Sequence, residues 1–263
     1  MELSRRVAYC GQQLDEIDPS IVIRGVEVGT PEETIGSVSR MSGVGQRITN
    51  SHYETMEIAV IFGIDVPKKD LKLRQSVYDR VVAWALQSGS KKLEVNYVEN
   101  RIMQVDKVIL PGSGDLRDWT ADFRLIFRAY NVPFWQDLNP VKIAMNGMSG
   151  DAWSVITGNI RTVVNVRFTN RSGMRIEDLK VGTDEAFLQF ESLSLNGNEK
   201  LVIDHQDGLM RAKKIIGDRT ESAMAYIHYS SSDDLYISPG GRKISFSADR
   251  YGEWAFEIYG RYL

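Results

Sequence analysis

The sequence predicts a mainly β protein with one principal helix, divided into an N-terminal β-sandwich with that helix and a C-terminal β-sandwich. Three observations lead to this fold class. Strand-like alternation of apolar and polar residues fills most of the 263 residues. One segment, Asp70 to Gln87, has a helical period instead. After Asn131–Pro140 the helical period disappears, and short strands with turn signals follow.

Five segments of the N-terminal half read as strands. Ile21–Val28 is rich in β-branched residues, and Lys91–Val98 with Arg101–Leu110 forms a hairpin around Glu99-Asn100. Trp119–Tyr130 alternates over twelve residues, which fixes its register strongly. Glu54–Phe62 places four apolar residues on one face before Pro67 ends the strand, namely Met56, Ile58, Val60 and Phe62.

The helix is expected to begin after Asp70 as N-cap and to end at Gly89 as the C′ residue. It carries two adjacent apolar stripes, one of Leu73, Val77, Val81 and Trp84, and a second of Leu71, Tyr78, Val82 and Leu86. The remaining polar arc is narrow. Two interpretations follow: the helix lies deep in its own domain, or the second stripe meets another subunit.

The domain boundary is expected near residue 138, which gives domains of residues 1–138 and 139–263. Pro133, Pro140 and a polar pair between them mark the junction. The turns of the second domain include Asn-Gly and Pro-Gly-Gly. Its eight predicted strands are Val141–Met145, Thr162–Thr169, Arg175–Val181, Ala186–Phe190, Lys200–Asp204, Asp234–Ile237, Arg242–Ala248 and Trp254–Tyr262.

Composition favours a soluble globular protein. The formal net charge is −3, and neither half has a global excess of charge that would attract nucleic acid or an anionic membrane. Met1–Gly11 lacks the apolar core of a signal peptide, and no apolar run approaches about 18 residues. Cys10 is the single cysteine, so no intramolecular disulfide is expected, and it reads as a buried or idle thiol.

No catalytic, cofactor-binding or metal site is predicted. His52, His205 and His228 lack metal-site spacing, and Asp204–Gly208 reads as a turn, with a carboxylate–imidazole site as the alternative. Two glycine pairs, Gly43-Val44-Gly45 and Gly112-Ser113-Gly114, lack a nucleotide-binding context. Four carboxylate doublets are expected in solvated loops: Asp15-Glu16, Glu32-Glu33, Asp184-Glu185 and Asp233-Asp234. Four aromatic residues are expected in the core, with sugar stacking as the alternative: Trp153, Trp254, Tyr226 and Tyr229.

From Asn146 onward the chain resembles a known family. The motifs that carry the resemblance are Asn146-Gly147, Trp153, the run Thr157–Thr162, the run Leu195–Asp204, Leu235–Gly241 and the final Tyr259–Leu263. These are similar to the distal tail proteins of long-tailed, non-contractile bacteriophages and related prophages. The first half resembles the N-terminal ring domain of that family, a helix packed on a β-sandwich like that of tail-tube proteins.

The resemblance implies a hexameric ring at the distal end of the tail tube in the virion, assembled in the host cytoplasm. Such a ring joins the tube to the tail-associated hub protein and to receptor-binding proteins or fibres, and DNA passes through it without specific recognition. Residues 1–138 would form the ring, and residues 139–263 a peripheral galectin-like sandwich. Galectins use a His-x-Asn-x-Arg motif, whose histidine is missing before Asn165-Val166-Arg167.

Three hypotheses follow from these features. The first is a structural hub without enzymatic activity, cofactor or membrane insertion. The second is a carbohydrate-binding sandwich that recognises surface glycans. The third is a hydrolase whose carboxylates converge through folding. The exposed loops Gly29–Gly45 and Pro111–Arg117 are candidates for partner contacts.

Overall fold

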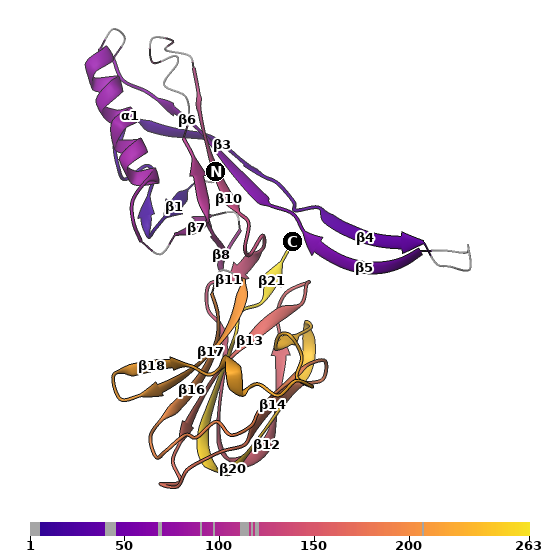
Figure 1. Ribbon diagram of the computed structural model, residues 1–263. Helices are drawn as coiled ribbons and strands as arrows, with labels where there is room; N and C mark the ends of the chain where they lie inside the picture. Colours follow the sequence, from indigo (N-terminus) through magenta and orange to yellow (C-terminus); the bar gives the residue numbers. More distant parts are fainter. Residues whose placement is uncertain are drawn as a thin grey trace. The chain divides into compact units, whose positions relative to one another are not determined.

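A computed structural model describes residues 6–39, 46–67, 70–89, 91–96, 98–110, 116, 118, 121–206 and 208–263. The chain divides into two compact units, Met1–Trp135 with Leu263, and Gln136–Tyr262 (Figure 1). The predicted boundary at residue 138 lies three residues after this division. Most described residues are in strands, and α1 (Leu71–Ala85) is the one α-helix among them, so the predicted fold class is confirmed.

Two larger sheets and a separate two-stranded one lie in the first unit. One of the larger sheets has the order β3-β6-β10-β9 and consists of β3 (Ile21–Val28), β6 (Met56–Ile64), β10 (Phe123–Ala129) and β9 (Lys107–Ile109). The other contains, in the order β2-β1-β7-β8, the strands β2 (Gln12–Gln13), β1 (Val7–Tyr9), β7 (Lys92–Val95) and β8 (Arg101–Gln104). The predicted hairpin around Asn100 is present, since Leu93 pairs with Met103. Its second strand, predicted as Arg101–Leu110, is however broken after Gln104, and Lys107–Ile109 belongs to the other sheet as β9. The short β11 (Trp135–Asp137) spans the division between the units.

The alternation of β6 and β10 places their apolar side chains in one core. Phe123, Leu125 and Phe127 pair with β6 residues in an antiparallel register, and all three are buried. The predicted inward face of β6 is confirmed, because its four apolar residues are each at most 1% exposed: Met56, Ile58, Val60 and Phe62. Trp119 and Thr120, the first residues of the predicted strand before β10, lie outside the described residues.

Helix α1 packs against β10 through aromatic contacts. The ring centroid of Trp84 lies 6.1 Å from that of Phe127, and that of Tyr78 lies 5.4 Å from that of Phe123. Asp70 caps the helix as predicted, since its side chain accepts a hydrogen bond from the amide of Leu73.

The predicted role of Gly89 as the C′ residue is wrong. Leu86 is the C-cap, with a φ of −97°. Gly89 instead lies against Cys10, where a Cβ would meet the Cys10 side chain at 3.4 Å. That distance is an ordinary van der Waals contact, so neither a left-handed turn nor a steric conflict requires glycine here.

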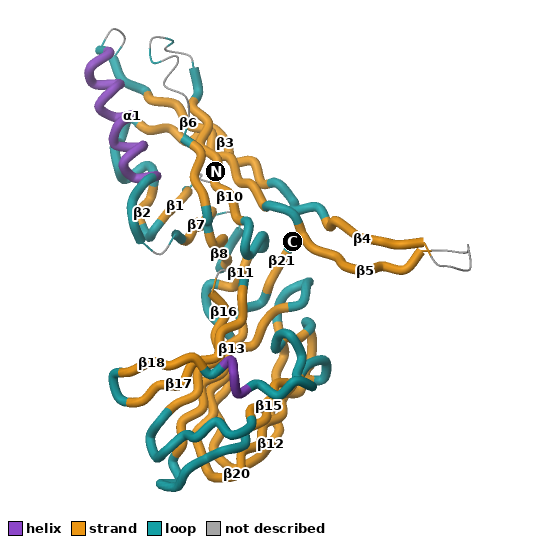
Figure 2. The backbone as a smooth tube through the Cα atoms, in the orientation of Figure 1, coloured by secondary structure: helices purple, strands orange, loops and turns teal. Residues whose placement is uncertain are grey.

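The segment predicted as the loop Gly29–Gly45 contains a strand, β4 (Glu33–Ser39), which forms a two-stranded hairpin with β5 (Gln46–Tyr53). The hairpin forms a sheet of its own and extends away from the β3–β6 sheet of the same unit (Figures 1 and 2). Residues 40–45, between the strands, are outside the described part of the chain, and so are residues 111–115 of the predicted loop Pro111–Arg117.

The second unit is built around two long antiparallel strands, β12 (Val141–Ile156) and β20 (Gly240–Ile258). They pair along their whole length, with a register shift between Gly147 and Ser149. The sheet order is β15-β14-β20-β13-β16-β17-β18, and β12 pairs with β20. The remaining strands are β13 (Thr162–Asn170), β14 (Leu179–Thr183), β15 (Phe187–Phe190), β16 (Lys200–Gln206), β17 (Leu209–Ile216), β18 (Arg219–Ser222), β19 (Tyr236–Ile237) and β21 (Arg261–Tyr262).

Several strands of this unit differ from the sequence prediction. The strand predicted as Val141–Met145 continues to Ile156, and the one predicted from Arg175 begins at Leu179. Arg242–Ala248 and Trp254–Tyr262 were expected as separate strands, but β20 runs through both as far as Ile258. The strands β17 and β18 fall in a segment for which no strand was predicted. One apolar cluster fills the unit, with Phe168, Trp254 and Phe256 at its centre. A short 3-10 helix, Met224–Tyr226, follows β18.

Among the described residues, no helix is both long enough and apolar enough to cross a membrane.

Candidate functional site

Helix α1 is fixed in place by one buried cation. The side chain of Arg74 is fully buried and donates hydrogen bonds to the backbone carbonyls of Leu116, Asp118 and Ala121, at 2.9, 2.6 and 3.4 Å. A buried guanidinium needs such acceptors, because an unpaired charge is costly away from water. These bonds tie the helix to the segment that precedes β10. The outer surface of the helix is therefore presented on a rigid support.

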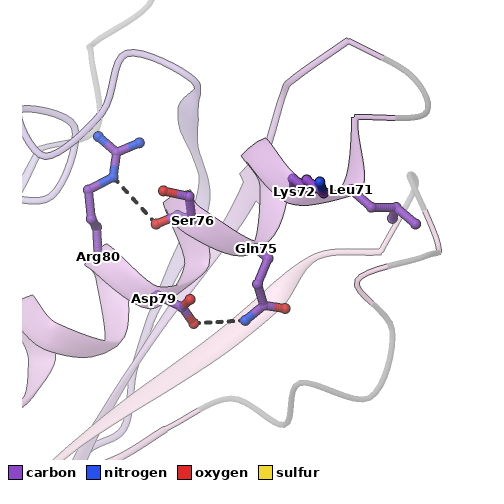
Figure 3. A pocket seen from close by; sticks show the side chains of 6 residues that line it. All are labelled: Leu71, Lys72, Gln75, Ser76, Asp79 and Arg80. Carbon is purple, nitrogen blue, oxygen red and sulfur yellow. Dashed lines mark hydrogen bonds between the residues drawn. The ribbon is translucent and has the colours of Figure 1, made fainter.

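The outer surface of α1 carries a shallow depression of about 580 Å³ (Figure 3). Its lining consists of Leu71, Lys72, Gln75, Ser76, Asp79 and Arg80. Gln75 donates to the Asp79 carboxylate at 2.7 Å, and Arg80 forms a 2.6 Å ion pair with Asp18. Hydrogen bonds from the Ser20 hydroxyl and then the Ser20 amide, followed by the charge of Arg80, hold the pKa of Asp18 below its ordinary value, against the opposing effect of burial. The depression is polar at its centre and apolar at the start of the helix.

Large apolar side chains remain exposed at both ends of the helix. Leu71 is 41% exposed, Leu73 39% and Leu86 62%. The first predicted stripe is buried at Val77, Val81 and Trp84, but not at Leu73. The second is buried at Tyr78 and exposed at both leucines that end it, Leu71 and Leu86. Part of the second stripe is thus free to contact another molecule, as one of the two interpretations of the sequence requires.

The β4–β5 hairpin is a second exposed feature. Each of its strands has a hydrogen-bonding edge without a strand partner among the described residues. Ile35, on β4, is 52% exposed. The base is anchored, since Thr34 donates to the Glu54 carboxylate at 2.6 Å and Tyr53 meets Phe134 edge to face at 5.0 Å. A two-stranded ribbon is marginally stable alone in water, so this element is expected to gain stability from a neighbour.

The histidine of the segment Asp204–Gly208 lies in a strand rather than the predicted turn. His205 belongs to β16 and is almost buried, with its Nδ1 2.9 Å from Asn165 Oδ1 and its Nε2 2.5 Å from Asp234 Oδ1. Because both ring nitrogens are engaged within the protein, neither is presented to a ligand. Burial lowers the pKa of Arg261, and the nearby Asp234 carboxylate opposes that effect. This arrangement ties β13, β16 and the segment before β19 together.

The other residues considered for chemistry are dispersed. Cys10 is half-buried, and burial followed by the Cys10 contact raises the pKa of Tyr9 to about 12. His228 contacts the Ser230 hydroxyl at 2.7 Å, and His52 is exposed. Three carboxylate doublets lie in turns or bends: Asp15-Glu16, Asp184-Glu185 and Asp233-Asp234. Within the part of the chain that the structure describes, no three His, Cys, Asp or Glu side chains gather as metal ligands.

The prediction that four aromatic residues lie in the core is correct for one of them. Trp254 is 1% exposed and packs between Phe168 and Phe246. Trp153 is 72% exposed and Tyr229 91%, while Tyr226 is 37% exposed. The alternation of side chains along a strand explains Trp153. Ala152 and Ile156 lie on the face of β12 that points into the core, so Trp153, one residue after Ala152, lies on the opposite, outward face.

Comparison with known proteins gives structural matches without sequence matches. No protein-family model and no curated protein matches the chain. The crystal structure of the SPP1 Dit protein, described as a paradigm of the hub adsorption apparatus in phages that infect Gram-positive bacteria, matches with a TM-score of 0.63. The sequences are 12% identical, and the match covers 98% of this chain and 99% of the SPP1 protein.

A chain of the phage p2 baseplate, in its activated conformation with strontium, matches with a TM-score of 0.50 at 10% identity, over 97% of both chains. The likeness to SPP1 Dit extends through both units. This protein therefore has the fold of that phage protein along nearly its whole length. The resemblance to distal tail proteins, predicted from short turn and strand motifs, is confirmed at the level of the fold.

Proposed function

We propose that this protein is a structural component of a phage tail tip, a ring-forming hub at the distal end of the tail tube. The observation that carries the proposal is the match to SPP1 Dit over 98% of this chain and 99% of that one. A match that includes both units argues for the role of the whole molecule. A match restricted to a common β-sandwich would favour a shared module instead.

The exposed elements of the first unit support self-assembly. A ring is closed by head-to-tail contacts, so each subunit must offer two different surfaces to its neighbours. The leucines at the ends of α1 offer one apolar surface, and the unpaired edges and exposed Ile35 of the β4–β5 hairpin offer another. Pairing these edges between subunits would also protect them from aggregation. Obligate interfaces of this kind bury on the order of 2,000 Å² or more.

The finer assignments follow from the same resemblance. We assign residues 1–138 to a hexameric ring and residues 139–263 to a peripheral, galectin-like domain. The partners would be the tail tube protein, the tail-associated hub protein and a receptor-binding protein or fibre. DNA would pass through the channel without specific recognition, and the protein would be incorporated into the virion tail after assembly in the host cytoplasm. This role needs binding surfaces and no catalytic step.

The test is the assembly state of the purified full chain. Native mass spectrometry is expected to detect six copies of the 29.7 kDa chain, and negative-stain microscopy is expected to show sixfold rings with a central channel. Leu86→Glu places a charge in the proposed apolar contact, which should weaken self-association by roughly 30- to 150-fold, or about 2–3 kcal/mol per interface. Met174→Glu is a matched control, because Met174 in the second unit is equally exposed, at 62%.

Both variants should keep the circular dichroism spectrum of the wild type, since each changes an exposed side chain. A wild-type protein that stays monomeric at its highest soluble concentration would contradict the ring. Equal assembly of wild type and Leu86→Glu would exclude the helix end from the interface.

A further inference from the structure

One face of the sheet in the second unit combines an exposed aromatic ring with positioned polar groups. It is formed by the second half of β12, the first half of β20, and β14 (Figure 1). In register, Trp153 lies opposite Lys243 and Asp151 opposite Ser245, and on the other side of β20 Ser245 lies opposite Gly182. The alternate residues of β12 and β20, such as Ala152 and Phe246, point into the core. We call the outward surface the Trp153 face.

Trp153 is placed where a strand ordinarily carries a polar residue. An outward position on a half-buried sheet faces water and is usually polar. Here two successive outward positions are apolar, since Trp153 is 72% exposed and Val155 is 71% exposed. The core does not use the ring, since the apolar cluster of the unit is completed without it. Exposed apolar surface of this size beside polar groups is typical of a binding site.

The polar groups beside Trp153 are held in fixed positions. Lys243 forms a 3.1 Å ion pair with Asp151, and both side chains stay one-third to one-half exposed. The Lys180 ammonium lies 4.6 Å from the centre of the Phe187 ring, a cation–π contact that orients it. Next to these groups is a depression of about 380 Å³, lined by Ser149, Gly150, Asp151, Lys180, Ser245, Phe246 and Ser247. Its volume is near the lower end of the range for small-ligand sites.

The chemistry of these groups fits an uncharged sugar. A pyranose ring has a face of C–H bonds, which packs on an aromatic ring, and hydroxyl groups at its rim, which both donate and accept hydrogen bonds. Asp151 supplies an acceptor, Lys243 a donor, and the serine hydroxyls supply both. Lys243 is neutralised by Asp151 within the protein, which leaves Lys180 as the one cation among the described residues that line the depression, whereas a phosphate or sulfate group is usually held by several cations.

A protein partner fits this face less well. A standard protein interface buries about 800 Å² on each side and is anchored by several large apolar or arginine side chains in a packed centre. The centre of the Trp153 face instead consists of an ion pair and serine side chains around a small depression. One aromatic platform next to a polar depression is the arrangement expected for a small polar ligand.

We propose that the Trp153 face binds an uncharged saccharide, with Trp153 as the stacking platform and Asp151, Lys243 and Ser245 as hydrogen-bonding partners. The site lies within the second unit, so binding does not depend on ring formation. On an assembled hub it would present a sugar-recognising surface in each copy. Many weak sites on one particle bind a polysaccharide surface far more tightly than a single site does.

The full-length chain should be applied to an array of neutral oligosaccharides built from hexoses and N-acetylhexosamines. The retained sugars are then titrated by calorimetry and by ligand-observed NMR. Such a shallow site should bind a single hexose with a Kd of roughly a few mM and longer chains more tightly. Trp153→Ala should weaken binding at least 10-fold, whereas Trp153→Phe, which keeps an aromatic face, should stay within about 3-fold of wild type.

Leu209→Ala is the matched control. Leu209 is 65% exposed, and its strand β17 is separated from β12 by three other strands of the sheet order. It should leave sugar binding and the melting temperature unchanged, and Trp153→Ala should also melt like the wild type because its side chain is exposed. Asp151→Asn should weaken binding several-fold. The proposal is wrong if the array retains no sugar, or if Trp153→Ala binds as tightly as wild type. It is also wrong if that variant impairs self-association and not sugar binding.

Discussion

Replacing Gly252 by alanine should strongly destabilise the second unit. Gly252 lies on β20 where it pairs with Asn170 of β13 and Gly147 of β12. A Cβ built on it would lie 2.2 and 2.4 Å from two carbons of the Phe168 ring and 2.8 Å from the carbonyl oxygen of Thr169. Ordinary carbon–carbon contacts are about 3.5–4.0 Å, so the ring would have to retreat by more than about 1 Å.

The core around Phe168 leaves no room for that movement. Phe168 is fully buried, and its ring centroid lies 4.5 Å from that of Trp254, which is itself 1% exposed and 4.7 Å from that of Phe246. Overpacking of a dense core costs typically about 1–3 kcal/mol, and a clash with both a ring and the backbone belongs at the upper end. We therefore expect a loss of about 3 kcal/mol and a melting temperature lower by roughly 10 °C.

Thermal unfolding followed by near-UV circular dichroism measures this effect, because the signal comes from the aromatic cluster. Gly241→Ala is the control on the same strand, since a Cβ there meets nothing within 4 Å. It should change stability by less than about 0.5 kcal/mol. In a double-mutant cycle, Phe168→Leu should recover part of the loss caused by Gly252→Ala. If Gly252→Ala melts within about 2 °C of wild type, the packing at this crossing has been misjudged.

Three further changes test other parts of the molecule. Trp84→Ala should cost about 3–5 kcal/mol in the first unit, measured by urea unfolding, because that side chain is 4% exposed and also donates a hydrogen bond to a backbone carbonyl. Asp137→Ala should cost about 1–3 kcal/mol, seen as a lower melting temperature, because its carboxylate accepts hydrogen bonds from a threonine hydroxyl, the Gly260 amide and the Tyr262 hydroxyl. The pKa of Asp18 is lowered in the folded state, so its ionised carboxylate stabilises the fold above about pH 4. This contribution to the free energy of unfolding disappears as the pH falls through the lowered pKa. Asp18→Asn should therefore make stability, measured by thermal unfolding at a series of pH values, depend less on pH on the acid side.

The periodicity of apolar residues correctly predicted the strands that have one face on the core and the other on solvent. The strand β3 begins and ends at the predicted residues, and β6 and β10 bury the predicted alternate residues, because each strand has one face on the core. Asp70 was recognised as a cap because its chemistry is local. These features depend on neighbours in sequence, which a sequence reveals directly.

Features that depend on distant partners were missed. The strand β4 lies in the segment Gly29–Gly45, which was expected to be a loop, and its pairing with β5 comes from backbone hydrogen bonds. Arg74 reads as a solvated helix residue until the carbonyls 42 to 47 residues away are seen to enclose it. Trp153 was assigned to the core because tryptophan usually is. Only the register with β20 shows that its side chain points outward, beside Lys243.

The pairing of β12 with β20 has a consequence for how this chain acquires its structure. Val141 pairs with Ile258 and Ile156 with Gly240, so the partners of β12 are synthesised roughly a hundred residues after it. During synthesis, the first of these strands leaves the ribosome long before the second exists, so its apolar side chains stay exposed for several seconds at about 5–20 residues per second. Contacts that are so remote in sequence also form slowly. Production of this protein should therefore benefit from slow expression at low temperature and from chaperones that shield nascent chains.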